Sequence, residues 1–105
     1  MLSSKQRQHL KSLAHPLKPI VMIGQKGLSD GVVKETDRAL HDHELIKVRL
    51  GDLAAAGQSE DDARASVADL LASQTKSEVV GIIGKLGILY RAREDDPAIK
   101  LPRDG

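Results

Sequence analysis

The chain has 105 residues, with 16 Lys or Arg, 15 Asp or Glu and four His, and its formal net charge at pH 7 is +1. This length predicts one domain with one core, and the core must be aliphatic because Tyr90 is the only aromatic residue. The absence of cysteine excludes disulfides, thiolate metal ligands and a cysteine nucleophile. No apolar run approaches the ~20 residues of a membrane span, and no signal peptide opens the chain, so we expect a cytoplasmic protein that makes no membrane contact.

The charge is unevenly distributed along the chain. Residues 1–50 hold nine Lys or Arg against five Asp or Glu, together with all four histidines, whereas residues 51–105 hold seven against ten. The first half is therefore the candidate for meeting an anion, although an uneven solvated surface would give the same counts.

The first predicted element is a helix that begins after Ser3, which forms a capping-box pattern with Gln6. Its apolar stripe consists of Leu10, Leu13 and Ala14, and Pro16 ends the helix by about residue 15.

An unbroken apolar run at residues 20–23 predicts a short central strand that is covered on both faces. After the sequence G-Q-K-G, Ser29 can cap a second helix, with Asp30 in its first turn. One side of this helix carries Val32, Val33, Thr36, Ala39 and Leu40.

Residues 45–50 alternate, which predicts a strand with Ile46, Val48 and Leu50 on its covered face and Lys47 and Arg49 on a solvated face. The sequence GDLAAAGQ then predicts a loop. Ser59 with Asp62 indicates the start of a third helix, with an apolar stripe of Ala63, Val67, Leu70 and Leu71.

Two apolar runs flank Gly84-Lys85 and predict a hairpin with a type II′ turn. The order is thus α-β-α-β-α-β-β. It predicts an α/β (α+β, two-layer) fold whose mixed four-stranded sheet contains two β-α-β crossovers between parallel strands, plus an antiparallel pair. We place the domain at residues 1–93 and expect residues 94–105 to form a polar tail that frays or packs in an extended conformation.

The G-Q-K-G turn joins the end of a strand to the start of a helix. Glycines let the chain turn sharply, and unpaired main-chain amides near Gly27, the positive end of the helix dipole and the charge of Lys26 would together suit a phosphate. An ordinary tight turn that needs a positive φ is the alternative. The spacing of Gly24, Gly27 and Gly31 does not match a dinucleotide fingerprint, and no Walker loop is present.

Catalytic and metal sites are poorly supported by the sequence. Residues two apart on a helix point roughly 200° away from each other, so His41 and His43 cannot share an ion on a continuous helix. Interaction with the helix dipole explains their position. With a single aromatic residue, the chain lacks the stacking platform of RNA-recognition sheets, so any RNA would be held by its backbone, as in the G-x-x-G loop of KH domains.

Three separated stretches, LKSLAHPLKPIVMIGQKGLSDGVV, HELIKVRL and IIGKLGILYRA, together with the terminal IKLPR, resemble the YhbY-like proteins, the stand-alone form of the CRM (CRS1-YhbY) domain. The resemblance covers about residues 2–103. It implies the fold derived above, which resembles the C-terminal domain of translation initiation factor three. It also implies a non-enzymatic RNA-binding protein that associates with ribosomal RNA in precursors of the large (50S) subunit. Apart from the resemblance, we expect a monomer without cofactor or metal.

The RNA-binding residues that the resemblance implies are the G-x-x-G loop and the basic side chains around it. They are Gly24, Gln25, Lys26, Gly27, Lys5, Arg7, Lys11, Lys18, Lys85 and Arg91. Two alternatives stay open: an adaptor that reaches the ribosome through ribosomal proteins, with a purely structural loop, and a small enzyme that binds a phosphorylated metabolite.

Overall fold

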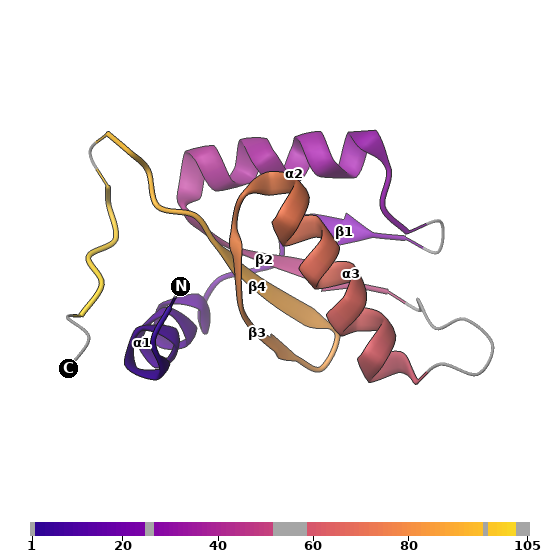
Figure 1. The fold of residues 1–105 in the computed structure, drawn as a ribbon, viewed down its shortest axis with the longest axis horizontal. Helices are drawn as coiled ribbons and strands as arrows, with labels where there is room; N and C mark the ends of the chain where they lie inside the picture. The colour runs from indigo at the N-terminus through magenta and orange to yellow at the C-terminus, as the bar shows by residue number, and fades with distance from the viewer. Residues whose placement is uncertain (1, 25–26, 52–58, 96, 103–105) are drawn as a thin grey trace.

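The computed structural model describes residues 2–24, 27–51, 59–95 and 97–102, and the predicted element order is confirmed within them (Figure 1). No helix in these ranges is long and apolar enough to cross a membrane. The elements are α1 (Ser4–Ala14), β1 (Val21–Ile23), α2 (Asp30–His43), β2 (Leu45–Leu50), α3 (Glu60–Thr75), β3 (Glu78–Ile83) and β4 (Leu86–Tyr90).

Each helix begins at the serine that the sequence indicated. The hydroxyl of Ser3 accepts a hydrogen bond from the Gln6 amide, and the Gln6 side chain accepts one from the Ser3 amide, so the capping box is complete. Ser29 and Ser59 cap α2 and α3 in the same way, each through its hydroxyl and the amide three residues later. These bonds satisfy amides that have no partner inside the helix.

The strands form one mixed sheet in the order β1-β2-β4-β3. β1 pairs parallel with β2, and β4 lies between β2 and β3 and is antiparallel to both, so β2 and β3 run parallel. The predicted central position of residues 20–23 is wrong: β1 is an edge strand. Only one of its faces is covered, and Met22 is 68% exposed on the other.

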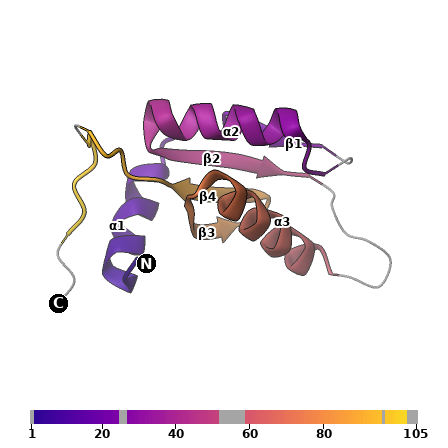
Figure 2. The same ribbon diagram turned by 45° about the horizontal axis from the view of Figure 1, so that its top comes forward.

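The sheet separates the apolar interior into two clusters instead of the single core that we expected. α2 and α3 pack on one face, and α1 adds a layer on the other face, at the end of the sheet where β2 begins (Figures 1 and 2). The larger cluster contains Val21, Ile23, Leu40, Ile46, Val48, Leu50, Ala68, Leu71, Ala72 and Leu89. The cluster under α1 contains Leu2, Leu10, Ala14, Leu45, Val80, Ile88 and Tyr90.

Two details of these layers differ from the sequence prediction. Lys47 is only 9% exposed because α1 covers it, and its Nζ donates to the main-chain oxygen of His15 at 3.0 Å. Of the two β2 residues predicted on a solvated face, only Arg49 is exposed. Two leucines predicted in apolar stripes lie outside the buried face of their helices, since Leu13 on α1 is 39% exposed and Leu70 on α3 is 50% exposed.

The hairpin has the predicted turn. Gly84 has a φ of +58°, while Lys85 is not among the residues with positive φ, which matches type II′ and excludes type I′. A β-bulge at Val80 shifts the register, so that Val79 pairs with Leu89 but Gly81 pairs with Ile88.

The described part of the tail packs against the domain, with Ile99 and Leu101 against the cluster under α1, and a buried acid, Glu44, holds its main chain. This residue caps the C-terminal end of α2 with a φ of +63°, and its side chain is fully buried. Its carboxylate accepts hydrogen bonds from the amides of Arg93, Ala98 and Ile99 at 2.9–3.1 Å. Of the two predicted behaviours of the tail, packing against the domain is thus the one observed in these residues.

Candidate nucleic-acid interface

The predicted glycine turn leads from the end of β1 into α2. The amide of Gly27 donates to the main-chain oxygen of Gly24 at 3.0 Å, and the φ of Gly27 is +75°, a conformation that disfavours side chains. The Gly27 amide is therefore already used inside the turn, and the expectation that it stays unpaired is wrong. Gln25 and Lys26 lie outside the described residues.

Beyond this turn, the first residues of α2 are exposed to solvent. The amides of Asp30 and Gly31 have no acceptor inside the helix, because they occupy its first two positions. They could donate to a phosphate, but the carboxylate of Asp30 brings a negative charge to the same place. Main-chain donors alone are thus a weak anion site, and neighbouring cations must supply most of the attraction.

The tip of the β3-β4 hairpin lies at the same end of the sheet as the glycine turn. The Leu50 amide donates to the main-chain oxygen of Lys85 at 2.6 Å, and the Gly51 amide donates to that of Ile23 at 3.3 Å. A Cβ at Gly51 would lie 2.9 Å from the Ile23 oxygen, so this junction requires glycine. With neighbouring strands ~4.8 Å apart, Lys85 lies two strands, or about 10 Å, from the end of β1.

Arg91 and Arg7 are engaged in contacts within the fold. Arg91 donates to the carboxylate of Asp37 at 2.6 Å and to the main-chain oxygens of Asp37 and Thr75, which ties β4 to α2 and α3. Arg7 donates to the main-chain oxygens of Val79 and Val80 on edge strand β3. Both guanidinium groups hold elements together, and their contact with RNA stays a prediction.

The three remaining predicted lysines occupy different places. Lys5 is exposed in the first turn of α1, whereas the stem of Lys11 lies over Gly81 of β3. Lys18 lines an apolar groove with His43, at the opposite end of β1 from Gly24. The structure therefore brings Gly24, Gly27 and Lys85 to one end of the sheet and leaves Lys18 and Arg91 at the other.

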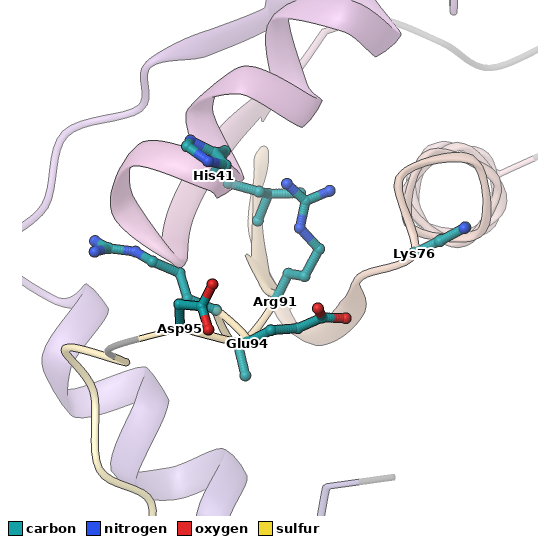
Figure 3. Close-up of a pocket in the computed structure, with 8 residues that line it drawn as sticks. His41, Lys76, Arg91, Glu94 and Asp95 are labelled. Carbon is teal, nitrogen blue, oxygen red and sulfur yellow. The ribbon is translucent and has the colours of Figure 1, made fainter.

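A cavity of about 560 Å³ at that other end does not suit a polyanion (Figure 3). Its charged lining mixes both signs, with Glu94 and Asp95 beside His41, Lys76 and two arginines. One of these arginines is Arg91, and the other, Arg93, donates to the main-chain oxygen of Asp42.

Tyr90 cannot stack on a base, because it is only 6% exposed under α1. Its burial raises the pKa of the phenol above the usual 10.0, and the nearby carboxylates of Glu44 and Glu78 raise it further. This side chain belongs to the core, so the only aromatic residue of the chain is absent from any interface.

Comparison with known proteins identifies the chain's relatives. The chain is 41% identical over 90 residues to a probable RNA-binding protein of Pseudomonas aeruginosa, covering 86% of this chain and 81% of the relative. It is 42% identical over 102 residues to an RNA-binding protein of Haemophilus influenzae, covering 97% and 96%. The solution structure of a Staphylococcus aureus protein, described as a candidate RNA binder, superposes with a TM-score of 0.81 at 35% identity, over 97% of this chain and all of the other.

The sequence profile of the CRS1/YhbY (CRM) domain matches residues 2–91, and both the relatives and the fold agree with this match. This chain belongs to the CRS1/YhbY (CRM) domain family.

Proposed function

We propose that this chain is a non-enzymatic RNA-binding protein whose ligand is ribosomal RNA in precursors of the large (50S) ribosomal subunit. The observation that carries the proposal is the position of the Gly24–Gly27 turn. It places a positive-φ turn, the exposed N-terminus of α2 and the Lys85 hairpin at one end of the sheet, in a chain whose relatives are named RNA-binding proteins.

In the proposed mechanism, side chains supply positive charge and main-chain amides supply hydrogen-bond donors. Lys26 supplies the positive charge in the turn, and the first amides of α2 donate to a phosphate oxygen. Lys85 meets a neighbouring phosphate on the hairpin side, about two strands away. Such contacts position a ribose-phosphate backbone and do not read base edges, so we expect preference for RNA shape and little sequence selectivity.

Nuclease digestion of the bound particle tests this function. The tagged chain is captured with pre-50S particles, and the captured material is treated with ribonuclease before washing. If RNA holds the chain on the particle, digestion releases it, and ribosomal RNA fragments crosslinked to the chain are recovered by sequencing. Retention on ribosomal proteins after complete digestion would contradict the proposal and support the adaptor function.

A further inference from the structure

Four residues form a continuous row across all four strands of the sheet. Met22 pairs with Arg49, Arg49 pairs with Leu86, and Leu86 pairs with Ile83. Side chains alternate along a strand, so Leu86 shares a face with Ile88, which packs under α1. By the same alternation, Met22 lies opposite the buried Val21 and Ile23. The row therefore lies on the face that carries α1.

α1 leaves this part of the face open. The helix sits at the end of the sheet where β2 begins (Figure 1). The row lies at the opposite end, because its residues are at or next to the last residues of β1, β2 and β3 and the first residue of β4. Met22 is 68% exposed, Ile83 is 58% exposed and Arg49 is exposed between them. Exposed apolar side chains that gather on one flat surface indicate an interaction site more often than isolated ones do.

The border between the row and α1 is positively charged. A pocket of about 250 Å³ there is lined by Ile83, Leu86 and Ile88 on the strands and by Lys11, His15 and Lys47. Lys47 is fixed by its hydrogen bond to the main-chain oxygen of His15, and among the described residues that line the pocket none carries a carboxylate. Together with Arg49, the lysines Lys11 and Lys47 border an apolar floor, so the surface complements a partner that carries both flat apolar groups and negative charge.

We propose that the row Met22-Arg49-Leu86-Ile83 is a platform for unpaired nucleobases of the bound RNA, an inference that rests on the proposed function. RNA is the occupant that the charges favour, and Met22 lies two residues before Gly24, so a strand held at the glycine turn continues onto the row. Base faces pack on the aliphatic side chains and on the Arg49 guanidinium plane, while Lys11 meets the phosphates. An aliphatic and guanidinium surface thus takes the place of the aromatic platform that the composition excludes.

The test compares two oligomers with equal numbers of phosphates, an oligoadenylate and an abasic ribose-phosphate chain. We expect the unmodified protein to bind the oligoadenylate about fivefold more tightly, at the weak end of base stacking on proteins. The variant Met22→Gln with Ile83→Gln should bind both oligomers equally. The control Leu70→Gln changes an apolar residue of similar exposure on the opposite face and should keep the preference.

Three results would overturn the proposal in distinguishable ways. If the unmodified protein binds both oligomers with the same affinity, bases do not contact the protein, although RNA binding stands. If the double variant keeps the preference, the bases lie elsewhere. If neither oligomer binds, the proposed function fails as well. In that second case, an acidic protein segment would be the occupant of the row if the double variant also no longer associates with pre-50S particles.

Discussion

Glu44→Gln is expected to lower the free energy of unfolding by about 2–4 kcal/mol. The carboxylate lies beneath the tail, where its Oε1 accepts from the Arg93 amide and its Oε2 accepts from the amides of Ala98 and Ile99. The side chain is fully buried, so water cannot replace these bonds without local opening.

The expected loss of stability follows from the difference between the carboxylate of Glu and the amide of Gln. The single oxygen of Gln can keep two of the three acceptor bonds, but its NH₂ group then faces the third amide, which loses its partner at a cost of about 1–3 kcal/mol. The two retained bonds lose the help of a negative charge, and neutral bonds are roughly half as strong as charge-assisted ones. For a domain of this size, the combined loss lowers Tm by about 10 °C or more.

Urea unfolding followed by far-ultraviolet circular dichroism measures this change. Glu35→Gln makes the same chemical change at an exposed position of the same helix, and we expect an effect within about 0.5 kcal/mol. A loss below about 0.5 kcal/mol for Glu44→Gln would refute the view that this carboxylate holds the tail.

Three further changes test the interface and the core. Lys26→Glu should weaken binding to single-stranded RNA by more than about 1 kcal/mol. The control Lys100→Glu makes the same change in net charge and should leave the affinity unchanged. A folded Lys26→Glu protein that binds RNA normally would show that the loop is not the binding site. Arg91→Ala should lower the free energy of unfolding by about 1–3 kcal/mol through its lost bonds to Asp37 and Thr75, and unchanged urea unfolding would contradict this. Because the pKa of Tyr90 is raised in the fold, the unfolded chain loses its phenolic proton first, so stability should fall as pH rises through about 10. Tyr90→Phe should lack this component, and tyrosinate absorbance should titrate above the usual pKa; identical pH profiles for the two proteins would contradict the assignment.

Features determined by neighbouring residues could be predicted from the sequence. The serine caps, the end of α1 before Pro16 and the type II′ turn at Gly84 all depend on contacts within a few residues. The mixed sheet followed from chain order, since a parallel pair needs a long connection and a hairpin needs a short one.

Features determined by distant pairing could not be predicted. The apolar run of β1 is typical of a central strand. In the sheet, however, β2 has β1 on one side and β4 on the other, and nothing pairs with the far side of β1 among the described strands, so β1 is at the edge. Lys47 alternates as a solvated residue would, but α1, more than 30 residues earlier, supplies the His15 oxygen that holds it. Glu44 gave no local signal, because its partners lie 49–55 residues later in the chain.

At the proposed interface, too, the features set by neighbouring residues could be predicted and those set by distant pairing could not. The positive φ of Gly27 follows from a glycine that must turn a strand into a helix, and it matches the ordinary tight turn that the sequence left open as the alternative. Which cations remain near that turn depends on the fold, since Arg7 and Arg91 find main-chain oxygens on other elements. The open row was missed because only the strand order brings Met22 and Ile83, which lie on the two edge strands, into one row.

Contact with RNA phosphates is tested most directly by measuring affinity for a single-stranded RNA over a range of salt concentrations. With about three to five phosphates engaged, the logarithm of the association constant should fall against the logarithm of salt concentration with a slope near −2 to −3.5. Affinity that does not change with salt would contradict a backbone-binding interface at the glycine turn.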